Sequence, residues 1–568
     1  MNIDELVAMH YTEFQDLVVS PDGQEVLVVL GNEDMPYEEY VYGRKNRSIW
    51  TCDLNGNREE KEIASADEDA HRPCWSPDRK QIAYLSRKSG QTEIWLMDRD
   101  GANKVQVTNS HFPGRDPYNE TQLSWSPDGL NIVYTCKPNG SYYGIAQALK
   151  DKEEIITGIQ VTSASDSSNK WKNAFQKANE FYESALYSQN VVTGENKILT
   201  TENCKIVDWA SGELVFVARG ATLKTVNIHT REMQDVYVAK QRIDSVKICE
   251  KALLIAYQTE QKIEMSTIKD GSLVQIVETT VPGYNMMIHT WSTNGKNLFV
   301  TSQQGVSTHL YQIDRSTGNV EKLTNDGHIV HSYEQEAKAV SHNNKEAILF
   351  PYTSPKAPME IWKYEHGEIE RVSHFNRNIR ESEIPNVLVI HYPSGGWMIE
   401  ALLVLPLHYN AEQTYPTLVY VHGGPEDHIN ASFTEVKCGR AQSAAHLLAS
   451  HGYAVLMPNF RGIEGYGEEL LSEIGSYNIM SKPYEDVMAG IDFLVKEGIA
   501  NPDELGIYGT SFGAWLTAWA IGQTGRFKGA IGMVSITTMS YLLLDTLAIR
   551  SLQTHRRGKE APRTSTYA

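Results

Sequence analysis

One serine lies in a sequence pattern that is typical of a catalytic nucleophile. Residues 505–515 read Leu-Gly-Ile-Tyr-Gly-Thr-Ser-Phe-Gly-Ala-Trp, which predicts a short apolar strand, a tight turn and the start of a helix. The turn has the form G-x-S-x-G, which lifts a serine hydroxyl clear of the edge of a sheet. Gly509 and Gly513 flank Ser511 because side chains at those positions would collide with the neighbouring strand and helix. The pattern therefore predicts a nucleophilic Ser511.

Backbone N–H groups near this serine could stabilise negative charge on a substrate oxygen. Ser511 would sit at a helix N-terminus, where N–H groups have no partner within the helix. A second glycine-rich stretch, His422-Gly423-Gly424-Pro425, follows an unbroken apolar strand at 417–421. Two glycines let the backbone approach a substrate closely, so we expect the Gly424 N–H to be an oxyanion donor. The alternative is a tight turn without a catalytic role. We interpret His422 as a structural residue, not a base.

The elements around these residues predict a doubly wound, mainly parallel α/β sheet from about residue 381 onwards. The alternation of apolar strands with amphipathic helices implies this architecture. We expect a hairpin of strands at 385–391 and 398–404, then strands at 417–421, 454–457, 505–509 and 529–535, with helices at 441–450, 484–497 and 512–521.

The first two-thirds of the chain repeat one all-β unit with a period of about fifty residues. A turn-punctuated repeat of this length predicts a β-propeller of about seven blades. We expect the tryptophans that open several copies to pack between blades, and we expect an insertion at 148–180. Clear copies of a Ser-Pro-Asp turn begin at 20–23, 75–78 and 125–129 and weaker ones at 291–295 and 341–344, whereas two copies around 208–212 and 243–257 have lost this signature.

The composition is that of a soluble globular protein, with 41% hydrophobic and 22% charged residues in a chain of 568. A net charge of −19 argues against a nucleic-acid partner. Six scattered cysteines without a Cys-x-x-Cys pair predict reduced thiols in a cytoplasmic protein. The sequence shows no membrane span, no signal peptide and no metal-binding spacing such as HExxH. We therefore expect no membrane contact, no metal and no cofactor.

In combination, these features resemble the prolyl oligopeptidase family of serine peptidases, particularly its acylaminoacyl-peptidase-like branch. The resemblance implies a β-propeller domain at 1–380 and an α/β-hydrolase domain at 381–550. It also implies that Ser511 is the nucleophile, that the N–H groups of Gly424 and Phe512 form the oxyanion hole, and that the substrates are short peptides. The propeller would restrict access to an interior cavity. The stretches that carry the resemblance are Val421–Pro425, Asn459–Gly462 with Gly465–Gly467, Asp486–Asp492 and Gly509–Gly513.

The segment after the serine departs from this pattern. In this fold the triad runs Ser, then Asp or Glu, then His along the chain. At roughly 30 residues per βαβ unit, the acid is expected roughly 60–80 residues beyond Ser511, but the sequence ends at Ala568. Asp545 and His555 lie too close together for a strand to separate them. We therefore expect a hydrolase domain without its last strands, a disordered tail at 551–568, no triad Asp or His, and little or no activity.

Three functions agree with these features. The first is a serine peptidase, of which this chain is an incomplete or inactive member. The second is a non-catalytic propeller that binds peptides or protein partners. The third is an esterase-like hydrolase, which a phenyl ester substrate would distinguish because esters need less leaving-group assistance. The sequence leaves open the substrate preference, exopeptidase or endopeptidase action and the oligomeric state.

Overall fold

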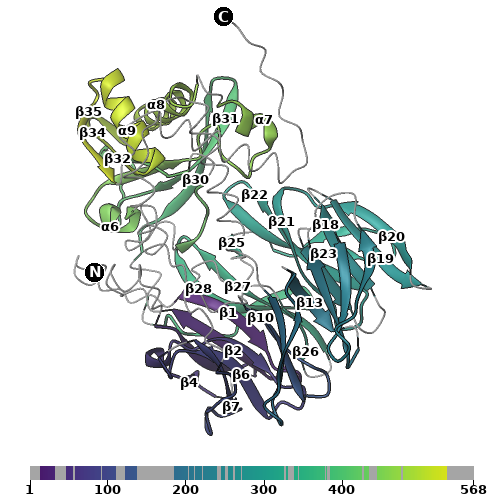
Figure 1. Cartoon of the computed structure of the whole chain (residues 1–568). Helices are drawn as coiled ribbons and strands as arrows, with labels where there is room; N and C mark the ends of the chain where they lie inside the picture. The colour runs from purple at the N-terminus through teal and green to yellow at the C-terminus, as the bar shows by residue number, and fades with distance from the viewer. Residues whose placement is uncertain are drawn as a thin grey trace, which may run out of the picture.

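In the computed structural model of the protein, a β-propeller lies beneath an α/β domain (Figure 1). The structure describes residues 13–533 except 32–45, 56–57, 91, 110–121, 137–184, 203, 210, 220–221, 239–244, 250–253, 260–261, 270–271, 325–327, 330–337, 343–344, 378, 380–383, 425–427, 434–443 and 475–477. The predicted insertion at 148–180 and the predicted tail at 551–568 therefore lie outside the described residues.

The first five sheets of the propeller are antiparallel, and each consists of four consecutive strands. Their strands are β1 (Glu13–Val19), β2 (Glu25–Gly31), β3 (Ser48–Asp53), β4 (Lys61–Ala64), β5 (His71–Trp75), β6 (Gln81–Ser86), β7 (Glu93–Asp98), β8 (Val105–Gln106), β9 (Leu123–Trp125), β10 (Asn131–Cys136), β11 (Ala185–Asn190), β12 (Asn196–Thr200), β13 (Lys205–Trp209), β14 (Leu214–Arg219), β15 (Thr222–Asn227), β16 (Met233–Val238), β17 (Ser245–Cys249), β18 (Leu254–Thr259), β19 (Lys262–Lys269) and β20 (Ser272–Thr280).

The sixth sheet has nine strands and contains two further four-stranded units. The short strand β25 joins them, because it pairs parallel with β23 and antiparallel with β27. Counting both units gives seven blades within the described residues, in agreement with the period of the sequence. The strands are β21 (Tyr284–Trp291), β22 (Asn297–Gln304), β23 (Ser307–Asp314), β24 (Val320–Lys322), β25 (His328–Ile329), β26 (Lys338–His342), β27 (Lys345–Ser354), β28 (Ala357–Glu365) and β29 (Glu368–Arg371).

The repeated Ser-Pro-Asp turn is held by the same hydrogen bonds in successive blades. In the second blade, the Ser76 hydroxyl donates to the Asp78 carboxylate at 2.8 Å and accepts the Gln81 N–H at 3.0 Å. Ser126 makes the equivalent bonds to Asp128 and Asn131 in the third blade. The turn residues recur because each serine satisfies both a side chain and the first N–H of the following strand.

The tryptophans that open the repeats pack between blades, which confirms the prediction. Trp125 and Trp291 are both buried, and each indole N–H crosses to a carbonyl of the preceding blade. Trp125 donates to Cys74 at 3.1 Å, and Trp291 donates to Lys247 at 3.1 Å. These side chains are therefore structural and do not stack on a ligand.

Six strands form the sheet of the α/β domain, in the order β30-β31-β33-β32-β34-β35. The four strands from β33 to β35 in this order run parallel, whereas β30 and β31 form the predicted antiparallel hairpin. Two apolar clusters flank the sheet. The elements are β30 (Val387–Ser394), β31 (Trp397–Val404), β32 (Tyr415–Val421), α6 (Ala445–Ser450), β33 (Ala454–Pro458), α7 (Glu468–Ser472), α8 (Ser481–Lys496), β34 (Ala500–Thr510), α9 (Phe512–Gln523) and β35 (Phe527–Met533).

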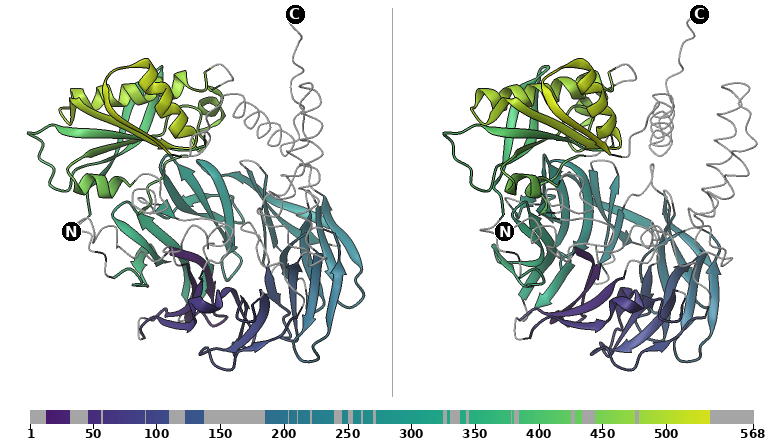
Figure 2. Two further views of the ribbon diagram at one scale, coloured as in Figure 1. Left: turned by 60° about the vertical axis from the view of Figure 1, so that its left-hand side comes forward. Right: turned by 90° about the vertical axis from the view of Figure 1, so that its left-hand side faces the viewer.

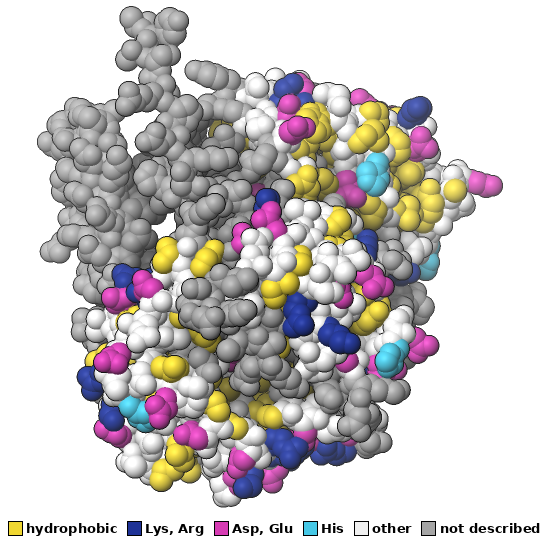
Figure 3. Space-filling model, turned by 90° about the vertical axis from the view of Figure 1, so that its right-hand side faces the viewer, with side chains coloured by type: hydrophobic (Ala, Val, Ile, Leu, Met, Phe, Trp, Pro, Cys, Tyr) yellow, Lys and Arg dark blue, Asp and Glu magenta, His cyan; other side chains and the backbone are white. Residues whose placement is uncertain are grey.

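The α/β domain sits on the last two blades, as both views in Figure 2 show. Strand β27 and the turn after it bond to this domain: the Phe433 N–H donates to the Thr353 hydroxyl at 3.1 Å, and Lys356 donates to Asn386 at 2.8 Å. The His446 Nε2 bonds to the Pro355 carbonyl at 2.7 Å. No helix among the described residues is long and apolar enough to span a bilayer. On the face in Figure 3, acidic and basic side chains are interspersed.

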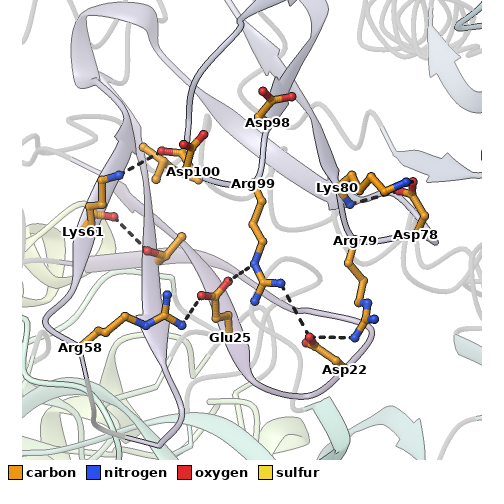
Figure 4. A pocket seen from close by; sticks show the side chains of 12 residues that line it. Asp22, Glu25, Arg58, Lys61, Asp78, Arg79, Lys80, Asp98, Arg99 and Asp100 are labelled. Atoms are coloured by element: carbon orange, nitrogen blue, oxygen red, sulfur yellow. Dashed lines mark hydrogen bonds and ion pairs between the residues drawn. The ribbon is translucent and has the colours of Figure 1, made fainter.

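Ion pairs brace the first blade against the second around a pocket of about 780 Å³ (Figure 4). The buried Glu25 carboxylate accepts from Arg58 at 2.6 Å and from Arg99 at 2.9 Å. Asp22 accepts from Arg79 of the second blade at 3.0 Å. Although burial raises the pKa of Asp22, hydrogen bonds from Ser20 and the Gln24 N–H and the charges of Arg99 and Arg79 lower it overall. These carboxylates and arginines of the pocket lining are therefore paired with one another.

We expect acid to weaken the junction through His446. Burial lowers the pKa of this imidazole to about 4, outweighing the hydrogen bond to the Pro355 carbonyl, which raises it. The unfolded chain binds a proton near pH 6.5, so the stabilisation is complete above that pH and is lost as the pH falls to about 4. The full loss is about 3 kcal/mol. Urea unfolding at several pH values should show this loss for the wild type but not for His446→Gln, which cannot titrate. Parallel curves would contradict the assignment.

We expect the Glu25→Gln variant to destabilise the propeller by about 1–2 kcal/mol, because two arginines lose a charged acceptor. The midpoint of the first urea transition measures this change. Asp100→Asn is the matched control from the same pocket, since Asp100 is exposed and Asn can still accept the Ala102 N–H. Equal midpoints for the two variants would show that Glu25 does not brace the blades.

Candidate active site

Ser511 occupies the strained turn between β34 and α9. Its backbone angles are φ 56° and ψ −117°, a region that residues other than glycine rarely adopt. Its N–H donates to the Met533 carbonyl of β35 at 3.0 Å, and its carbonyl accepts the Ala514 N–H at 3.1 Å. The surrounding strand and helix therefore hold the serine in this conformation at the first turn of α9.

Gly509 and Gly513 let this turn lie directly against the end of β32. Val421 pairs with Gly509 in the parallel register. A Cβ on Gly509 would lie 2.4 Å from the Val421 carbonyl oxygen, and a Cβ on Gly513 would lie 1.9 Å from the same atom. Only glycine fits at either position. The collision that a side chain would cause is therefore the reason for both glycines, as the sequence pattern predicted.

The same contact places the Ser511 turn beside the start of the glycine-rich loop. A Cβ on Gly513 would also lie 2.7 Å from the His422 carbonyl oxygen. Gly424, two residues further on, is exposed and has φ +122°, a backbone conformation that favours glycine. Pro425 lies outside the described residues.

The side chain of His422 is packed into the domain. It is buried, its Nδ1 lies 2.7 Å from the Gly423 carbonyl, and its ring stacks on Phe460 with centroids 4.3 Å apart. Phe460 in turn contacts Phe512, with ring centroids 6.2 Å apart. This aromatic column joins the glycine-rich loop to the helix after Ser511, which fits a structural histidine.

Phe512 is the first residue of α9, and its side chain is fully buried. The N–H of a first helical residue has no acceptor within the helix. The helix also places its positive end at this N–H, where it favours negative charge. The turn can therefore offer a backbone donor next to the serine, and Gly424 lies two residues beyond His422, whose carbonyl adjoins Gly513.

A buried ion pair that the sequence did not single out holds the loop after β33. Arg461 and Asp486 are both fully buried, and the Arg461 Nη2 donates to Asp486 at 2.7 Å. The Arg461 N–H also donates to this carboxylate at 2.8 Å. Burial alone would lower the pKa of Arg461, but hydrogen bonds and charge from Asp486 and Glu485 raise it. Both residues lie in stretches that carried the family resemblance. That resemblance was the sequence signal that could have identified the pair.

Within the described part of the chain, the Ser511 hydroxyl makes no hydrogen bond to a histidine or a carboxylate. Asp545 and His555 lie outside the described residues. The absence of a triad acid and base therefore stays a prediction.

Comparisons with known proteins indicate the peptidase class that the sequence predicted. The model of the prolyl oligopeptidase family matches residues 440–567. An uncharacterized peptidase of Bacillus subtilis, YuxL, is 24% identical over 82% of this chain and 72% of its own length. Dipeptidyl-peptidase 5 of Porphyromonas gingivalis is 20% identical over 93% of this chain and 78% of its own length. The solved structure of Pyrococcus horikoshii acylaminoacyl peptidase superposes with a TM-score of 0.63 at 15% identity, covering 94% and 79% of the two chains.

By family resemblance these comparisons support a hydrolase of the serine peptidase class, and the fold is a propeller before an α/β-hydrolase domain. Residues 440–567 match the prolyl oligopeptidase family, and the chain as a whole is similar to peptidases and acylaminoacyl peptidases of this type. This confirms the resemblance predicted from the sequence.

We expect Gly513→Ala to destabilise the α/β domain by about 3 kcal/mol or more, since a methyl group there overlaps backbone atoms of β32. The matched control is Gly522→Ala in the same helix, where a Cβ meets no atom within 4 Å. Alanine at that position should stabilise the helix by up to about 1 kcal/mol. Thermal unfolding measures both variants, and a neutral Gly513→Ala would contradict the close contact.

Proposed function

We propose that the chain is a serine peptidase that hydrolyses short peptides through an acyl-enzyme on Ser511. The strained turn supports this role most directly. It holds a serine with positive φ at a helix N-terminus, directly beside a glycine-rich loop. Such strain persists only where the surrounding structure maintains it, and it concentrates at active sites.

In the proposed reaction, the Ser511 oxygen attacks the peptide carbonyl carbon while a base takes the hydroxyl proton. The negative charge that develops on the carbonyl oxygen would accept hydrogen bonds from the Phe512 and Gly424 N–H groups. Collapse of the tetrahedral intermediate releases the amine, which needs a proton, and leaves an ester on Ser511. Water then hydrolyses this ester.

The propeller would select substrates by size. Its sixth and seventh blades are bonded to the α/β domain through Val306 and Thr353. We propose that it admits short peptides and excludes folded proteins. The described cysteines form no disulfide with one another, which fits a cytoplasmic location.

Within the described residues, the Ser511 hydroxyl has no hydrogen bond to a base. If the triad acid and histidine are absent, as the sequence analysis predicts, we expect Ser511 to react slowly, since loss of triad function costs about a million-fold in turnover. Added imidazole can replace a missing histidine base, and general-base catalysis contributes about 10²–10⁴-fold.

The test is labelling of purified protein by a fluorophosphonate probe, with and without imidazole. We expect slow labelling that imidazole accelerates about tenfold or more, and no labelling of Ser511→Ala. Fast labelling without imidazole would keep Ser511 as the nucleophile but show that the chain supplies its own base. A folded protein that does not label under either condition would overturn the proposal and favour the non-catalytic propeller.

A further inference from the structure

One turn of the propeller inserts into the core of the α/β domain. Val306 lies between β22 and β23 in the sixth blade and is 2% exposed. It packs in the apolar cluster of the α/β sheet, together with Leu402, Tyr420 and Ile429. Two domains that could slide freely against each other would not bury a side chain of one domain in the core of the other.

The backbone of the same residue is bonded on both sides to the α/β domain. The Val306 N–H donates to the Glu400 carboxylate of β31 at 2.8 Å. The Val306 carbonyl accepts the Ala431 N–H at 2.7 Å. Ala431 belongs to the loop after β32, the loop that also carries Gly423 and Gly424. Val306 thus connects a strand of the sheet to this loop.

A second route leads from the same carboxylate to the same loop. The Tyr466 hydroxyl donates to Glu400 and accepts from the Asn459 amide at 2.7 Å. Asn459 bonds to the backbone of Ile429 twice, donating to its carbonyl at 2.9 Å and accepting its N–H at 2.7 Å. Burial, and then the Glu400 charge, raise the pKa of Tyr466, so the hydroxyl keeps its proton and donates.

The neighbouring glycines show how closely the two domains approach here. A Cβ on Gly305 would lie 2.4 Å from a Glu400 carboxylate oxygen. A Cβ on Gly465 would lie 2.3 Å from the Gln303 amide of β22, and one on Gly467 would lie 2.6 Å from the Tyr284 hydroxyl of β21. All three glycines have positive φ. This part of the junction is therefore packed without room for side chains.

We propose that the β22–β23 turn, through Val306, Glu400 and Tyr466, positions the glycine-rich loop opposite Ser511. These are positioning residues, because they act on the loop and not on the substrate. The inference rests on the proposed function for its catalytic consequence. Its structural part, that the sixth blade holds the loop at residues 429 and 431, does not depend on catalysis.

Two variants each weaken one link, the hydroxyl bridge of Tyr466 or the packing of the Val306 side chain, and each has a matched control. Tyr466→Phe removes one hydroxyl from the Glu400–Asn459 route. Its control is Tyr311→Phe in the propeller core, where the buried hydroxyl has no hydrogen-bond partner among the described residues. Val306→Ala shortens the inserted side chain. Its control is Val281→Ala, an equally buried propeller valine that packs in a separate cluster.

Hydrogen exchange tests the structural part. We expect the Ile429 and Ala431 amides to exchange at least about tenfold faster in Tyr466→Phe and Val306→Ala, while amides of β32 and α9 keep their rates. Both controls should match the wild type. Unchanged exchange at 429 and 431, or an equal rise throughout the α/β domain, would overturn the proposal, because the residues would then be merely structural.

Imidazole-assisted labelling of Ser511 tests the catalytic part. We expect at least a tenfold slower rate in both variants than in their controls, since a misplaced oxyanion donor loses transition-state stabilisation. Faster exchange with an unchanged labelling rate would overturn the link to the site. If the wild type does not label at all, the proposed function fails, but the exchange result still decides whether the turn holds the loop.

Discussion

The close contact between the Ser511 turn and the end of β32 is the constraint on which the candidate site depends. The Val421 carbonyl oxygen lies where side chains of residues 509 and 513 would otherwise begin. The parallel pairing of Val421 with Gly509 brings the two chain segments to the same edge of the sheet. This contact holds Ser511 at positive φ and starts the glycine-rich loop beside it. A looser turn would relax the strain and separate the two.

The propeller contributes a side chain to the core of the α/β domain and does not simply cover that domain. Val306 lies in the core of that domain, and His446 of α6 bonds to a carbonyl of the seventh blade. Buried contacts of this kind couple the stability of the junction to the loops that start from it. The two domains are therefore best regarded as one functional unit, in which the last two blades support the site.

Much of this arrangement could be predicted from the sequence because its signals are local. The Ser-Pro-Asp turn recurs in each clear copy because a serine hydroxyl bonds within five residues of itself. The predicted helix at 484–497 is α8 at 481–496, since its apolar face repeats with helical spacing. The strand predicted at 505–509 is longer, because β34 begins at Ala500 through a polar segment that carries no apolar pattern. Contacts such as Glu400 with Val306 have no such signal, since 94 positions separate the two residues.

The sequence by itself determined the repeat of the propeller, the alternation of the α/β domain and the placement of glycines around Ser511. Each of these follows from spacing and backbone freedom over a few residues. Only the tertiary structure decided which surfaces those glycines touch, where the buried Arg461–Asp486 pair lies, and that a propeller turn reaches the loop opposite the serine. The physical reason is that a close approach or a shared hydrogen bond requires two distant segments in one place. The conformational propensity of each segment carries no information about which distant segment it will contact.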